Sequence, residues 1–134
     1  MKNMVRQKFN TYPKNIRTKM QILRNLIYEV AENTEGVGEL EETLKWNEPA
    51  YLTSKTKSGT AIRIDWKLKN PDRIGMYLNC KTTLVSTWRI MFQDDLEFEG
   101  NRAILISVNT PIPKDKLLIC IKMALRYHLD KEKA

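Results

Sequence analysis

Long hydrophobic runs are missing from this chain of 134 residues, although 42% of its residues are hydrophobic. A helix needs roughly 18 uninterrupted apolar residues to cross a bilayer, and no segment between Val5 and Leu129 approaches that length. We therefore expect neither an integral membrane protein nor a membrane partner. The basic residues 1–10 are not followed by an apolar stretch with a cleavage site, so we also expect no secretory signal and a cytoplasmic location.

Cysteine and histidine are scarce. Cys80, Cys120 and His128 are the only residues of these types, and no CxxC or Cys/His cluster suggests a zinc site. The two cysteines are therefore expected to be reduced thiols in a reducing compartment. His128 is expected near the end of the last helix, where the helix dipole favours a cationic imidazole.

The motifs of common enzyme classes are missing as well. The sequence contains no GxSxG elbow, no HExxH, no GxxxxGK[ST] phosphate loop and no GxGxxG fingerprint. A cysteine–histidine pair is formally available from Cys80 or Cys120 with His128, but Cys120 lies among isoleucines and is interpreted as a packing residue. We expect a protein that is not an enzyme, and an enzyme of unrecognised type stays an alternative.

Charge is plentiful, with a formal net charge of +7, and it is unevenly distributed. Residues 1–24 carry seven basic groups and no acid, whereas residues 25–50 carry one lysine and seven glutamates. Residues 51–93 are again basic, and residues 94–134 are balanced. Such blocks can steer charged partners, but no RNA-binding, helix-turn-helix or zinc-finger motif accompanies them. A solvated surface is the first interpretation, and an acidic partner or nucleic acid bound by the basic N-terminal block is the alternative.

Hydrophobic spacing predicts helices at both ends of the chain. Apolar residues at steps of four, three, four and three predict an amphipathic helix over residues 13–32. This stripe consists of Ile16, Met20, Leu23, Ile27 and Val30. A shorter helix is expected over 37–44, ended by Pro49, and further helices are expected over 84–92 and from Leu117 to Leu129.

Alternation of apolar and polar residues predicts the strands. We expect them at about 51–56, 62–66, 74–78, 96–98 and 104–108. Short turns between neighbouring strands favour an antiparallel sheet. The predicted fold class is therefore α+β, with about five antiparallel strands covered on one face by the N- and C-terminal helices.

The segment from Glu42 to Tyr51 reads Glu-x-x-x-Trp-x-x-Pro-x-Tyr, and a Leu-Arg-x-Leu-Ile helix at 23–27 precedes it. With Asp65-Trp66 and residues 100–102 (GNR), this pattern resembles the YdhG-like family, a group of small bacterial proteins classed as a domain of unknown function. The resemblance covers roughly residues 12–129 and implies one YdhG-like domain over residues 1–134 with a frataxin-like fold. It also implies a binding or carrier role, with iron as the cofactor suggested by analogy with frataxin.

The same segment is the predicted ligand site. Two aromatic rings beside a proline-fixed bend, with polar neighbours, have the make-up of a small-ligand pocket. The predicted ligand-binding residues are Glu42, Lys45, Trp46, Asn47, Pro49 and Tyr51. The alternative is that Trp46 and Tyr51 fill the junction between the short helix and the sheet.

Two acidic sets are candidates for a hard cation such as calcium, magnesium or ferrous iron. Asp95, Glu97 and Glu99 alternate on one expected strand face, with side chains ~7 Å apart. A second set, Glu35, Glu39 and Glu42, has helical spacing. The alternative is solvated charge that protects a sheet edge.

A basic set is a candidate anion-binding face, with an ordinary solvated surface as its alternative. It consists of Arg63, Lys67, Lys81 and Arg89. Three classes of function therefore stay open: a binding or carrier domain for a small ligand, an interaction module for an acidic partner or nucleic acid, and an enzyme.

Overall fold

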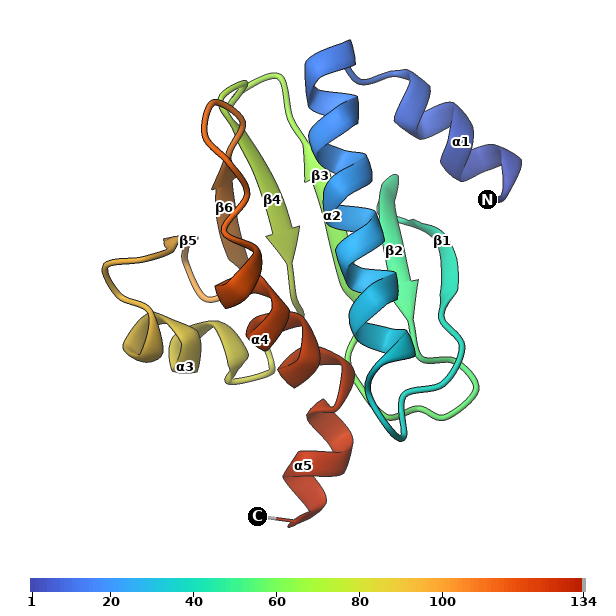
Figure 1. The fold of residues 1–134 in the computed structure, drawn as a ribbon, viewed down its shortest axis with the longest axis vertical. Coiled ribbons are helices and arrows are strands. Elements are labelled where there is room, and N and C mark those ends of the chain that lie inside the picture. The colour runs from blue at the N-terminus through green and yellow to red at the C-terminus, as the bar shows by residue number, and fades with distance from the viewer. Residues whose placement is uncertain (134) are drawn as a thin grey trace.

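The computed structural model describes residues 1–133, in which a six-stranded antiparallel sheet is combined with five helices (Figure 1). The helices are α1 (Asn3–Asn10), α2 (Lys14–Glu32), α3 (Leu84–Met91), α4 (Lys114–Leu125) and α5 (Tyr127–Lys133). The strands are β1 (Glu41–Lys45), β2 (Glu48–Leu52), β3 (Ile62–Trp66), β4 (Arg73–Tyr77), β5 (Glu97–Glu99) and β6 (Ala103–Ser107). Their order in the sheet is β1-β2-β3-β4-β6-β5. The predicted α+β class is confirmed, with six strands in place of about five.

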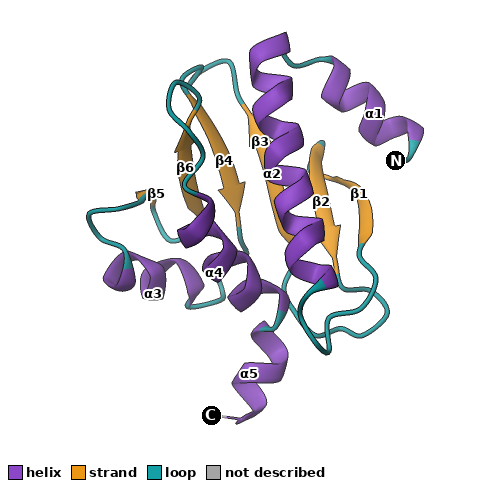
Figure 2. Cartoon of the chain, viewed as in Figure 1, coloured by secondary structure: helices purple, strands orange, loops and turns teal. Residues whose placement is uncertain are grey.

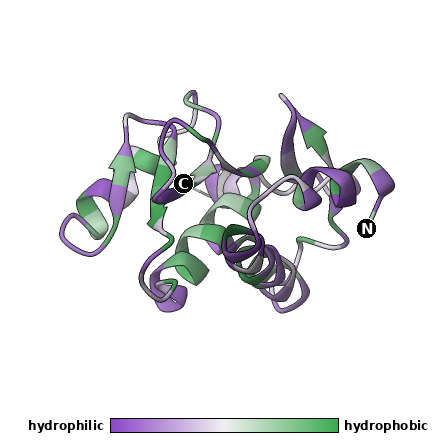
Figure 3. Ribbon diagram, turned by 90° about the horizontal axis from the view of Figure 1, so that it is seen from above, coloured by the Kyte–Doolittle hydropathy of each residue, from purple (hydrophilic) through white to green (hydrophobic). Residues whose placement is uncertain are grey.

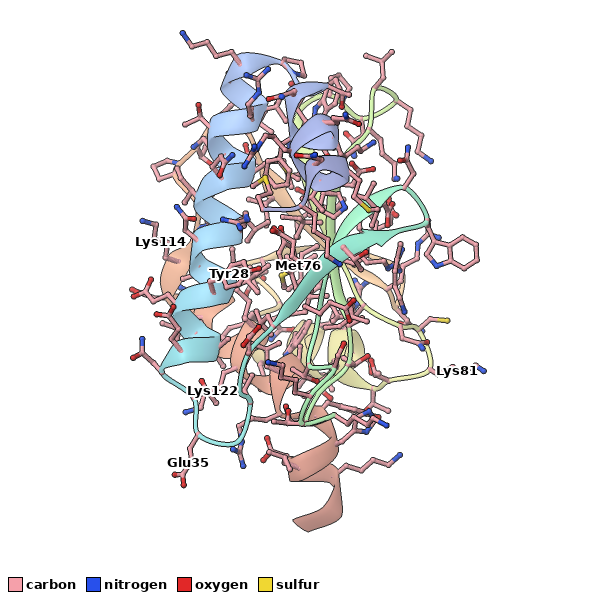
Figure 4. All side chains as sticks on the ribbon, turned by 90° about the vertical axis from the view of Figure 1, so that its right-hand side faces the viewer. Tyr28, Glu35, Met76, Lys81, Lys114 and Lys122 are labelled. Carbon is pink, nitrogen blue, oxygen red and sulfur yellow. The ribbon has the colours of Figure 1, made fainter. Side chains whose placement is uncertain are left out.

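One face of the sheet is covered by α2 and α4, which pack against each other (Figure 2). Seen from above, the two helices form one layer on one side of the strands (Figure 3). The predicted apolar stripe of α2, from Ile16 to Val30, is buried in the core. Lys114 of α4 and Lys81 of the loop after β4 mark the covered and the open side (Figure 4). Among residues 1–133, none of the helices combines the length and the hydrophobicity that a membrane span requires.

The helix expected over 37–44 is wrong, because residues 41–44 belong to β1 and residues 37–40 are not helical. Gly36 and Gly38 have φ values of 89° and 71°, a left-handed conformation that ends the helical path and favours glycine. The following residues alternate, with Leu40 and Glu42 buried and Glu41 exposed. The glutamates at 35, 39 and 42 therefore do not share a helix face.

A basic helix, α1, precedes α2 and was not expected from the sequence. Val5 and Phe9 are buried, and α1 packs against β1 and β2. The Tyr12 hydroxyl, in the turn between the helices, donates a hydrogen bond to Asp65 over 2.5 Å. Burial first, and this hydrogen bond second, raise the pKa of Tyr12.

The expected final helix is divided at Arg126 into α4 and α5. The loop after β2 stabilises the break between the two helices. The Ser58 hydroxyl donates to the Leu125 carbonyl over 2.7 Å. In return, the His128 backbone N–H donates to the Ser58 carbonyl over 2.8 Å. His128 therefore lies in the first turn of α5 and not near the C-terminal end of the last helix. The strand expected over 51–56 is likewise displaced, because β2 ends at Leu52 and this loop follows.

Candidate functional site: a basic hollow on the open face of the sheet

The β1–β2 hairpin places the predicted ligand residues on two sides of the sheet. Glu42 and Tyr51 are directly paired across the strands and are both buried on the helix side. Glu42 accepts two hydrogen bonds from Arg24 of α2, over 2.5 and 3.0 Å. The Tyr51 ring packs edge-on against Tyr28, with the centroids 5.8 Å apart. This half of the set is core packing.

The other half lies at the tip of the hairpin, where Lys45 and Glu48 flank a two-residue turn. Trp46 and Asn47 form this turn with φ values of 55° and 61°, the left-handed pair that a tight antiparallel hairpin prefers. Asparagine is common in that conformation, but a bulky tryptophan is unusual there. Trp46 is 86% exposed. The structure therefore does not bring Trp46 and Tyr51 together. Pro49 is buried beside the turn.

A row of directly paired residues crosses the open face of the sheet. Arg63 lies opposite Tyr77, and both alternate with core residues of β3 and β4. Their neighbours in the row are small, namely Ala50 and Ala103, which are fully buried. A Cβ atom at Gly75 would come within 2.4 Å of the Tyr77 ring. The aromatic ring therefore lies flat on the sheet because position 75 has no side chain.

Glu48 holds two basic groups above this ring. Its two carboxylate oxygens accept from Arg63 Nη1 and Lys67 Nζ, each over 2.7 Å. Lys67 also donates to Asp65 over 3.0 Å. Burial lowers the pKa of Lys67 and these hydrogen bonds raise it, so that the net pKa is about 12. Both cations lie over Tyr77, 5.6 and 5.4 Å from the ring centroid. Their positions are thus set before any ligand arrives.

Two adjoining hollows occupy this face. The larger, of about 760 Å³, is lined by Trp46 and by four basic side chains, and no carboxylate of the described residues lines it. These basic residues are Lys45, Lys57, Arg63 and Arg102. The smaller, of about 260 Å³, shares Arg63 and Arg102 and adds Lys67, Lys69 and Arg73, with Glu48 and Glu99 as its acidic groups. We call the two together the basic hollow.

Comparisons with protein-family models, curated proteins and solved structures gave no match. The resemblance to the YdhG-like family therefore stays a prediction.

The expected anion-binding set is only partly assembled. Arg63 and Lys67 lie in the basic hollow. Arg89 instead donates to the Gly100 carbonyl over 2.6 Å, and Lys81 does not line the hollow. Arg73 and Arg102 complete the hollow in their place. The alternation along β4 is a sequence signal for Arg73, but Arg102 lies in a turn that no periodicity predicts.

The predicted metal set Asp95, Glu97 and Glu99 is divided among other partners. Glu97 pairs with Arg73 over 2.7 Å, and Glu99 pairs with Arg102 over 3.2 Å. Asp95 lies in the turn before β5. No group of three or more His, Cys, Asp or Glu residues that could hold a metal ion occurs within the described part of the chain.

Neither candidate cysteine–histidine pair is formed in the described structure. Cys80 and His128 both line the larger hollow and are exposed, and no hydrogen bond joins their side chains in the described structure. The His128 ring packs against Tyr127, with 5.2 Å between centroids. Cys120 is fully buried in the core, as its interpretation as a packing residue predicts.

Proposed function

We propose that the protein is a non-catalytic binding module that holds an anionic ligand in the basic hollow on the open face of its sheet. One observation carries this proposal: seven lysine and arginine side chains line the hollow, against two carboxylates. A concave surface with charge of one sign attracts ligands of the opposite sign. Guanidinium groups add directed, bidentate hydrogen bonds to phosphate or carboxylate.

The ion pair of Arg102 does not close the hollow to a ligand. Among the described residues, Arg102 pairs only with Glu99, and both side chains are well exposed, at 60% and 42%. Such surface pairs are worth about 0–1 kcal/mol, so an incoming anion competes with them easily. Lys45, Lys57 and Lys69 form no salt bridge with the described residues.

The basic N-terminal block supports an anion-binding role less well. Arg17 donates to three backbone carbonyls around the turn between α1 and α2. Arg24 is held by Glu42, and Lys19 donates to the Thr110 carbonyl over 2.8 Å. Part of this charge therefore stabilises the fold, and the remainder is spread over two helices.

Iron handling in a frataxin-like fold is the second candidate. The order of elements supports that fold, since helices from both ends of the chain cover one face of an antiparallel sheet. A ferrous ion would, however, meet only basic charge along residues 1–28, which contain no carboxylate. Anaerobic titration with ferrous iron, followed by NMR amide shifts, tests this candidate: shifts confined to one acidic group at micromolar iron would favour it over the basic hollow.

Retention on a heparin column tests the main proposal. The double variant K45E/R102E reverses two exposed charges of the hollow, and K114E/K122E makes the same change on α4, on the covered side (Figure 4). We expect wild type to elute at the highest salt, K114E/K122E slightly earlier and K45E/R102E much earlier. Equal elution of the two variants would mean that bulk charge is responsible and that the hollow is not a binding site.

A further inference from the structure

Trp46 carries two unfavourable features that nothing else in the described fold explains. The residue is 86% exposed, and its backbone lies at φ 55°, where a bulky side chain is strained. Glycine or asparagine would form the same turn without either cost. Features of this kind concentrate at functional sites, where the surrounding structure supports them.

The backbone of Trp46 is held at a defined place beside the charges of the basic hollow. The residue stands on a two-residue turn closed by the paired Lys45 and Glu48, not on a long loop. It lines the larger hollow together with Lys45, Arg63 and Arg102. A flat aromatic face and several cations are therefore presented to the same ligand.

Resting on the proposed function, we infer that the anionic ligand is a single-stranded nucleic acid, with a base stacked on Trp46 and phosphates held by Arg63, Arg102 and Lys45. Proteins that bind single strands combine a basic groove with aromatic side chains on which bases stack. A duplex does not offer a free base face to such a ring, because its bases are already stacked and paired.

The surroundings of the ring favour a nucleic acid over an acidic protein. Aromatic residues at protein interfaces lie within an apolar centre surrounded by a polar rim. Of the large apolar side chains that are exposed in the described structure, Trp46 alone lines the hollow. Its sequence neighbours Lys45 and Asn47 are exposed and polar. A ligand that is planar on one part and anionic on another fits this arrangement.

Fluorescence anisotropy with three labelled nucleic acids and one labelled peptide tests the inference. The nucleic acids are a 12-nucleotide oligothymidylate, an abasic strand with the same number of phosphates, and a 12-base-pair duplex. We expect the oligothymidylate to bind more tightly than the abasic strand by roughly 5- to 150-fold, the range for one stacked base. A poly-glutamate peptide measures binding of an acidic polypeptide.

Two substitutions at the turn separate stacking from folding. Trp46→Gly removes the ring and suits the left-handed φ, so the variant is expected to fold at least as well as wild type. It should bind oligothymidylate no better than the abasic strand, and W46Y should keep most of the preference because tyrosine also stacks. K45E/R102E should weaken both strands and lower the salt slope of oligothymidylate binding by about 1.4, for two phosphate contacts.

Each contrary outcome overturns a defined part of the reasoning. Equal binding of both strands, unchanged in Trp46→Gly, would refute base stacking and leave an anion-binding hollow. Binding of the duplex or poly-glutamate as tight as that of oligothymidylate would refute single-strand recognition. No binding to any probe at low salt, together with no heparin retention, would refute the proposed function itself.

Discussion

Gly59→Ala is expected to weaken the packing of the loop after β2 against the end of α4. A Cβ atom at position 59 would lie 2.4 Å from the carbonyl oxygens of Ala124 and Leu125. These atoms belong to the backbone, so the contact cannot be relieved by a side-chain rotation. The loop would have to move away by about 1 Å to restore an ordinary van der Waals separation.

That movement breaks hydrogen bonds that the loop makes with α4. Thr60 N–H donates to the Ala124 carbonyl over 3.0 Å, and the Ser58 hydroxyl donates to the Leu125 carbonyl over 2.7 Å. Each contributes about 0.5–1.5 kcal/mol net. The lower entropy of the unfolded alanine variant returns about 0.4–1 kcal/mol. We therefore expect the free energy of unfolding to fall by about 1–2 kcal/mol, from the balance of these effects.

Urea denaturation measures this loss, and hydrogen exchange measures its location. The amides of His128 and Leu129 donate to the Ser58 carbonyl, so their protection should fall in Gly59→Ala. Gly100→Ala is the matched control, because its φ of 54° brings conformational strain but no atom lies within 4 Å of the added Cβ. It should lose about 1 kcal/mol without changing exchange at α5. A Gly59→Ala variant as stable as wild type, with α5 still protected, would refute the reasoning.

Three further predictions concern buried groups. Iodoacetamide at pH 8 should alkylate exposed Cys80 alone, because burial raises the pKa of the Cys120 thiol to about 12. Mass spectrometry should detect a second adduct only when the protein is unfolded in urea, and two adducts on the folded protein would contradict this prediction. Tyr51→Phe should leave stability unchanged or raise it by up to about 1 kcal/mol, since the buried hydroxyl has no hydrogen-bond partner among the described residues; a loss of more than about 0.5 kcal/mol in urea denaturation would indicate a bond. Glu42→Gln should lower the free energy of unfolding by about 2 kcal/mol in the same assay. This is less than the loss expected on breaking a fully buried ion pair, because the Arg24 side chain is 20% exposed. A loss below about 0.5 kcal/mol would show that the pair contributes little.

The elements with a regular hydrophobic period could be predicted from the sequence. The stripe of α2 and the alternation in β3 place their apolar residues correctly. The segment of β1 was misassigned because its alternating pattern includes Glu42, a charged residue at a buried position. Only the distant Arg24 makes that burial possible, so no local pattern could indicate it.

The candidate site was predicted in part for the same reason. Trp46 and Lys45 were predicted to be ligand-binding residues, and both line the hollow, whereas Tyr51 points to the opposite face. A one-residue difference in register decides the face of a strand. Arg73 and Arg102 are far in sequence from the predicted site. The pairing of β4 with β6 brings both of them to the basic hollow.

The sequence by itself determined the α+β class, the antiparallel pairing of close strands and the apolar side of α2, because these depend on local periodicity and short turns. Only the tertiary structure decided which charges are used by the fold and which remain available to a ligand. Glu42 and Arg24 pair within the covered side, while Lys45, Lys57 and Arg102 line the hollow on the open face. The physical reason is that charge pairing and concavity depend on distances between strands and helices far apart in the chain, which local spacing does not encode.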